Sequence, residues 1–229
     1  MNTNRRIATL VGIFFIIGTA AGISSVVVTQ PVLGHPDFLN QIAAHESRMV
    51  VGALLVLLMG LALVPVPILL YPLFKRQNEV LALSYVVVRG ALEMIGYFAM
   101  SVCWLFLIGL GKEYTTAGAA HQPDLQALGE VLLKGSDGVS QLLVIIFSLD
   151  ALILYYLLYR TQLVPRWISI WGFISILLHL SYVFIKLFSV NASDSLDLLN
   201  ISILIQEMVM AGWMIAKGFN RVALARLAE

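Results

Sequence analysis

Six long, mostly apolar stretches dominate the sequence. A bilayer core is about 30 Å thick and needs about 20 apolar residues per helix. Backbone groups in lipid must satisfy their hydrogen bonds within their own segment, so such stretches form helices. The predicted spans are Ile7–Val28, Arg48–Phe74, Val80–Gly111, Gly138–Tyr159, Trp167–Phe188 and Leu196–Ala216. The sequence therefore predicts an all-α, polytopic six-helix transmembrane bundle, with one domain over residues 1–229.

The composition agrees with a lipid setting. Charged residues make up only 12% of the chain and hydrophobic residues 60%, whereas a soluble domain carries about 25% charged residues. Arg5 and Arg6 precede the first apolar run, as in a signal peptide. That run exceeds the ~7–15 residues of a signal h-region, so we interpret it as a retained first span. Cys103 lies in an apolar run and is interpreted as a core residue.

Lysine and arginine residues are distributed unevenly between the two ends of the spans. The richer side holds Arg5, Arg6, Lys75, Arg76, Arg160, Arg166, Lys217, Arg221 and Arg226. The poorer side holds Arg48, Lys112, Lys134 and Lys186. Cytoplasmic loops carry the excess of positive residues. Both termini are therefore expected in the cytoplasm.

Two longer connections lie on the opposite, outer side. Gln30–Ser47 carries apolar residues at helical spacing. His121–Gly135 has Pro123 at a suitable first helical position and Gly135 as a suitable stop. Each connection is expected to hold a short helix, which either caps the bundle or lies on the membrane surface.

Two local patterns predict how particular helices bend and pack. Pro65 and Pro67 each remove a backbone hydrogen bond from the second span, so a kink is expected there. Gly18 and Gly22 form a small-xxx-small pattern in the first span, which favours close contact with another helix.

Three segments resemble a known family. They are LYYLLYRTQLVPRWISIWGFI (Leu154–Ile174), FKRQNEVLALSYVVVR (Phe74–Arg89) and EMVMAGWMIAKGF (Glu207–Phe219). They are similar to recurring segments of bacterial multi-span membrane proteins that are catalogued only as a domain of unknown function. The resemblance implies a multi-pass protein of the bacterial cytoplasmic membrane, and it transfers no catalytic residue.

Ionisable residues in the third and fourth spans are the first candidates for a site. Arg89 lies about 14 Å from the inner end of its helix, near mid-depth. Glu93 and Tyr97 follow at four-residue intervals, so the three share one stripe. Asp150 lies at similar depth in the fourth span. Ionisable residues cost free energy in a membrane, so they face the bundle interior and find partners.

The last two spans add further polar residues. In the fifth, a helical face consists of Gly172, Ser175, His179, Tyr182 and Lys186. The sixth places Asn200 and Glu207 seven residues apart, with Glu207 near mid-depth. If the helices converge, Glu93, Asp150 and Glu207 share one guanidinium and one imidazole. Like charges at short range cannot all remain ionised. At least one carboxyl is then protonated, Glu93 or Glu207 being preferred, or a bound cation neutralises the group.

The leading interpretation is a protein that binds or translocates a small polar or cationic solute, coupled to protons. Arg89 and Glu93 would form a fixed pair, and Asp150 and Glu207 would be the ligand or proton carboxylates. His179 would act as a relay, while Tyr97 and Tyr182 would complete the site. The alternative is a non-catalytic membrane partner or assembly subunit, whose buried charges only lock helices together. An intramembrane enzyme ranks third.

Several chemistries lack the residues they need. Haem held by two imidazoles needs two histidines at membrane depth, and only His179 qualifies. An intramembrane zinc site needs about three ligands around an open position. Motifs for serine hydrolases, phosphate loops and zinc proteases are missing. Nucleic-acid binding would need a basic domain. We expect no cofactor, no metal and no catalytic residue, and the lipid bilayer is the expected surrounding.

Overall fold

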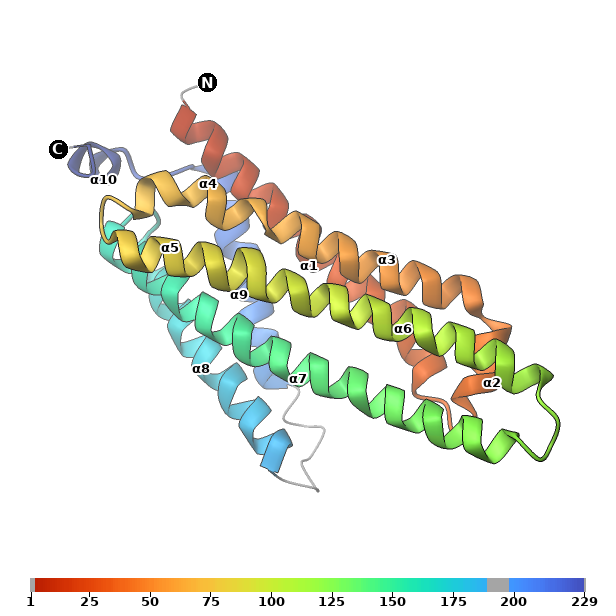
Figure 1. The fold of residues 1–229 in the computed structure, drawn as a ribbon. Helices are drawn as coiled ribbons and strands as arrows, with labels where there is room; N and C mark the ends of the chain where they lie inside the picture. The colour runs from red at the N-terminus through yellow and green to blue at the C-terminus, as the bar shows by residue number, and fades with distance from the viewer. Residues whose placement is uncertain (1–2, 189–197, 229) are drawn as a thin grey trace.

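A computed structural model describes residues 3–188 and 198–228, the side chains of residues 186–188 and 198–200 excepted. All regular elements within these ranges are helices (Figure 1). They are α1 (Thr3–Leu33), α2 (Phe38–Ala44), α3 (Glu46–Leu63), α4 (Pro65–Phe74), α5 (Glu79–Val87), the π-helical turn η1 (Val88–Leu92), α6 (Glu93–Thr116), α7 (Gln122–Thr161), α8 (Arg166–Phe188), α9 (Leu198–Ala216) and α10 (Arg221–Arg226). The predicted all-α class is confirmed.

Within the described residues, five helical segments are long and apolar enough to cross a membrane. They are Thr3–Leu33, Glu46–Phe74, Glu79–Thr116, Gln122–Thr161 and Arg166–Ile185, and Ile201–Ala216 is a shorter apolar helix. Many large apolar side chains face outward, including Val27, Ile95 and Phe106, which are 67%, 64% and 63% exposed. Apolar surface of this extent requires lipid rather than water around it. The chain is therefore a multi-pass integral membrane protein.

The long helices pack in sequence order around the bundle. α1 contacts α3, α3 contacts α6, α6 contacts α7, α7 contacts α8, α8 contacts α9, and α9 contacts α1. Figure 1 shows α1, α3, α6 and α7 extending furthest together, while α8 and α9 lie toward the end that holds both termini. The α4–α5 and α7–α8 turns lie at this same end. The closed order of contacts directs one side of every long helix toward a common interior.

The predicted bend in the second span is confirmed as a break. α3 ends at Leu63, and Pro65 is the first residue of α4. Val64 N–H still donates to Gly60 O at 3.1 Å, so the backbone turns without losing this bond. Proline suits the first turn of a helix, because the backbone N–H groups of that turn have no acceptor within the helix.

The close approach predicted for Gly18 and Gly22 is also confirmed. A Cβ on Gly18 would lie 2.8 Å from Leu63 Cδ2, and one on Gly22 would lie 2.7 Å from Met59 Sδ. Both neighbours belong to α3. The two glycines therefore let α1 and α3 pack at a distance that a larger side chain would prevent.

The predicted short helix over His121–Gly135 is wrong as a separate element. Pro123 does lie in the first turn, but α7 continues through Gly135 without a stop. A glycine inside a helix costs only about 1 kcal/mol relative to alanine, and the surrounding residues favour helix. The resulting 40-residue helix is about 60 Å long and extends well beyond a 30 Å bilayer core.

The other predicted outer helix is present and caps the bundle. α2 buries Phe38, Leu39 and Ile42. Phe38 and Leu39 lie against Gly129 of α7, and Leu39 O lies 2.9 Å from where a Cβ of Gly111 in α6 would be. α2 thus packs across the far ends of α6 and α7, which supports the capping interpretation.

Candidate functional site

Arg89 lies on an irregular turn in the middle of the third apolar segment. The backbone between α5 and α6 forms the π-helical turn η1, and Arg89 is its buried residue, with 2% exposure. Such single π turns within α-helices occur frequently at functional sites. A Cβ on Gly90 would lie 3.6 Å from Pro67 Cγ of α4, so the two irregular backbone segments are neighbours.

The closest partner of Arg89 is on another helix. Arg89 Nη1 donates to Asp150 Oδ1 of α7 at 2.8 Å. The predicted pair with Glu93 is present but longer, with 3.9 Å between Arg89 Nη1 and Glu93 Oε2. Arginine followed by glutamate at i, i+4 is the weaker order for a helical ion pair. The fixed pair of the site is therefore Arg89 with Asp150.

Two aromatic rings lie against the Arg89 guanidinium. Its Cζ is 5.1 Å from the ring centroid of Phe15 in α1 and 5.8 Å from that of Phe147 in α7. A guanidinium over a ring face is stabilised by the ring quadrupole, most strongly where water is excluded. Arg89 is thus held by contacts from α1 and α7 in addition to those within its own segment.

Glu93 and Tyr97 form the second part of the cluster. The Tyr97 hydroxyl donates to Glu93 Oε1 at 2.6 Å. Glu93 is fully buried and Tyr97 is 8% exposed. The stripe predicted for Arg89, Glu93 and Tyr97 is therefore a single buried face of the η1–α6 segment.

Four buried polar atoms of this region lack a hydrogen-bond partner among the described residues. They are Tyr85 Oη, Arg89 Nε, Glu93 Oε2 and Asp150 Oδ2. The Glu93 and Asp150 carboxyls both approach the same nitrogen, Arg89 Nη1, at 3.9 Å and 2.8 Å. Buried polar groups without partners are costly. The cluster therefore has capacity for a shared proton, ordered water or a polar ligand group.

Glu207 of α9 lies at the edge of this cluster and lines a cavity. It is 9% exposed and shares the lining of this cavity with Tyr97 and Phe147. The cavity has a volume of about 550 Å³ and is lined by residues of α1, α3, α6, α7 and α9. Tyr97 and Glu207 are its polar contacts with the cluster. Val26 and Val27 also line it and are 60% and 67% exposed, so the cavity opens on the lipid-facing surface.

The residues predicted from the fifth span approach the cluster through Phe147. The His179 ring packs edge-on against Phe147, with 5.6 Å between ring centroids, and the Arg89 guanidinium lies 5.8 Å from the centroid of the same ring. Tyr182 is half-buried three residues further along α8. Ser175 of the same predicted face hydrogen-bonds with Ser202 of α9 at 2.7 Å between the two Oγ atoms, and the side chains of Lys186 and Asn200 lie outside the described part of the structure.

A second polar contact escaped the sequence analysis. The Tyr155 hydroxyl donates to Gln206 Oε1 at 2.6 Å, and Gln206 Nε2 donates to Ile168 O at 3.0 Å. This chain of bonds joins α7, α9 and α8 directly beside Glu207. The sequence feature that could have indicated this contact is Gln206, an uncharged polar residue inside an apolar segment. A search restricted to ionisable residues overlooks it.

The cluster brings several ionisable side chains together in a buried setting. The carboxyl groups of Glu93 and Asp150 lie 3.9 Å and 2.8 Å from Arg89 Nη1, and the Glu207 carboxyl lines the neighbouring cavity. Within residues 3–188 and 198–228, no cluster of three or more His, Cys, Asp or Glu side chains could hold a metal ion.

The fold and this cluster define a multi-pass membrane protein with an ion pair buried between its helices. The chain belongs to the family described as a domain of unknown function, DUF4386, which matches residues 10–218. This confirms the family resemblance over most of the chain. No curated protein and no solved structure matches the sequence.

Proposed function

We propose that this protein binds or translocates a small cationic solute with an apolar body, in exchange with protons. The observation that carries the proposal is the cavity of about 550 Å³ that places the Glu207 carboxyl and the Tyr97 ring beside a carboxylate-rich cluster. Most of its other lining is apolar, including Val56, Met100 and Leu143. An apolar wall with a carboxyl group at one end is complementary to an organic cation.

Charge balance supplies the link to protons. With all groups ionised, Glu93, Asp150 and Glu207 leave two negative charges after pairing with Arg89. Like charges this close in a low dielectric do not all persist. One proton shared by Glu93 and Asp150 removes the first charge. A proton or a solute cation at Glu207 removes the second, so the two compete. His179 would relay protons behind Phe147, and Tyr182 would lie on the same route.

We further propose six spans with both termini in the bacterial cytoplasm and one domain over residues 1–229. The sixth span is α9, whose described apolar part is Ile201–Ala216. Both termini and the two short turns lie at one end of the bundle (Figure 1). This end carries Arg5, Lys75, Arg160 and Lys217 among other basic residues, as the positive-inside rule requires of the cytoplasmic side.

The direct test is binding of ethidium, a planar organic cation, to the purified protein in detergent. Glu207→Gln removes the carboxylate with little change in shape. We expect its apparent Kd for ethidium, measured by fluorescence anisotropy, to rise about tenfold, the value of one charge-assisted contact. Glu113→Gln is the matched control, because Glu113 is exposed on α6 and outside the cavity lining. Equal affinity of the wild-type protein and Glu207→Gln would refute the cation site.

The alternative is a non-catalytic membrane partner whose buried charges hold its helices together. The enclosure of Arg89 by Asp150, Phe15 and Phe147 favours this role for the ion pair itself. This alternative does not account for the cavity or for the position of Glu207 in its lining. Failure of the wild-type protein to bind organic cations, with an intact fold, would favour this alternative.

A further inference from the structure

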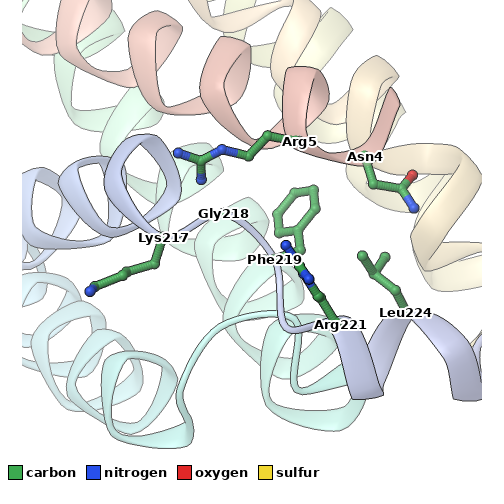
Figure 2. A pocket seen from close by; sticks show the side chains of 7 residues that line it. All are labelled: Asn4, Arg5, Lys217, Gly218, Phe219, Arg221 and Leu224. Atoms are coloured by element: carbon green, nitrogen blue, oxygen red, sulfur yellow. The ribbon is translucent and has the colours of Figure 1, made fainter. Parts of the chain in front are cut away.

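A second cavity lies at the end of the bundle where the termini lie. It has a volume of about 620 Å³ and is formed by the start of α1, the turn between α9 and α10, and α10 itself (Figure 2). Its lining residues are Asn4, Arg5, Lys217, Gly218, Phe219, Arg221 and Leu224. It is separate from the Glu207 cavity, with which it shares no lining residue.

The walls of this cavity are fixed by backbone geometry. Gly218 has φ of +74°, a conformation in which a side chain would be strained, and its N–H donates to Met214 O at 3.1 Å. The Arg5 guanidinium donates to Ile215 O at 2.6 Å and Ala216 O at 3.0 Å. Arg5 therefore caps the carboxyl end of α9 and ties α1 to it, which stabilises the helix dipole.

The cavity lining combines basic side chains with the apolar side chains of Phe219 and Leu224. Arg5, Lys217 and Arg221 contribute three positive charges, and no carboxylate lines the cavity. Figure 2 shows the Arg5 guanidinium above Gly218 and the Arg221 side chain beside Phe219, with Leu224 at one edge and Lys217 at the other, its side chain extending outward. Lys217 and Arg221 are exposed, and the ion pairs found among the described residues involve Arg89 and Lys112 instead.

The cavity lies at the level of the membrane interface. It follows directly on the apolar segment Ile201–Ala216. Trp213 lies one turn before Lys217 and packs edge-on against Trp167, with 6.4 Å between ring centroids. Tryptophan gathers at membrane–water interfaces. A lipid phosphate lies at this same depth, and basic pockets between helices on the cytoplasmic side suit anionic headgroups.

We propose that this cavity binds a phosphate group, with Lys217 and Arg221 as its charged contacts and Phe219 and Leu224 packing on the apolar part of the ligand. The phosphate could come from an anionic phospholipid headgroup or from a soluble phosphate. The inference is independent of the cation site, because Glu207 takes no part in it.

The test measures binding of phosphatidylglycerol to the purified full chain by native mass spectrometry, with phosphatidylcholine as the zwitterionic reference. We expect phosphatidylglycerol to bind more tightly, and Lys217→Gln/Arg221→Gln to weaken its binding about 25-fold, as expected for two interfacial cations. Arg226→Gln is the matched control, because Arg226 lies on α10 but outside the lining. It should bind like the wild type.

A parallel titration with inorganic phosphate distinguishes the sources. If phosphate raises the melting temperature of the wild type but not of the double variant, while the lipid binds both equally, the ligand is a soluble phosphate. If neither ligand distinguishes the wild type from the double variant, the proposal is wrong. Melting of each variant in phosphate-free detergent solution checks folding. If the double variant is unfolded there, Lys217→Gln alone is used, with an expected weakening of about fivefold.

Discussion

Replacing Arg89 by methionine is expected to destabilise the folded bundle by about 3–5 kcal/mol, the cost of removing one partner of a buried ion pair. Asp150 and Glu93 would remain buried without their cation, and the guanidinium contacts with Phe15 and Phe147 would be lost. Methionine retains much of the side-chain volume, so the loss reports on charge rather than on a cavity. Equilibrium unfolding by SDS in mixed micelles, followed by circular dichroism, measures the change.

Two further variants distinguish the contribution of the ion pair to stability from that of side-chain packing. Asp150→Asn should cost less than Arg89→Met, because Glu93 Oε2 still lies 3.9 Å from Arg89 Nη1. Arg89→Met/Asp150→Leu should recover part of the loss, because apolar replacements of a buried pair are frequently tolerated. If Arg89→Met leaves the unfolding free energy unchanged, the ion pair does not stabilise the bundle.

Replacing Gly12 by leucine is expected to cost about 2–3 kcal/mol by overpacking the α1–α9 contact. A Cβ on Gly12 would lie 2.6 Å from Ala211 O and 2.7 Å from Ile215 Cγ1. The first of these is a backbone atom, so α1 and α9 must separate. Thermal unfolding in detergent would show the loss as a lower Tm.

Gly212→Leu is the matched control for this contact. Gly212 lies on α9 one residue after Ala211, but a Cβ there would have no heavy atom within 4 Å. Its replacement should leave the Tm close to that of the wild type. Equal destabilisation by both variants would mean that the close approach of α1 and α9 does not limit the side chain at position 12.

The apolar segments could be predicted from the sequence because one physical requirement governs them. A bilayer demands about 20 apolar residues per crossing, and every predicted span is helical over its described residues, apart from the break at Val64. Helix ends were less predictable, because a helix does not stop where the lipid stops. Gly135 illustrates this, since α7 passes through it and continues into the outer region.

The residues of the candidate site could be predicted from the sequence, but the contacts between their side chains could not. Arg89, Glu93, Asp150 and Glu207 stand out because ionisable residues are rare at membrane depth. Their partners depend on helix rotation, which the π turn at Val88–Leu92 alters locally. Nothing in the sequence distinguished Phe15 and Phe147 from the other nine of the 11 phenylalanines. Lys217 and Arg221 were interpreted only as orientation signals, because their shared cavity depends on how α10 folds back.

The structure distinguishes two environments within the buried cluster. Arg89 and Asp150 are enclosed and closely paired, which suits a fixed support. Glu207 faces a cavity that opens toward lipid, which suits a group that exchanges ligands. In our account, protons and cations compete at Glu207, so cation affinity should rise with pH as the proton is removed.

The most direct measurement of this competition is proton release on cation binding. Ethidium is added to the concentrated protein in lightly buffered detergent solution, and released protons are followed with a pH indicator. The account predicts roughly one proton released per ethidium bound to the wild type, because one charge replaces another at Glu207. Binding without any proton release by the wild type would contradict the exchange of protons and cations at this site.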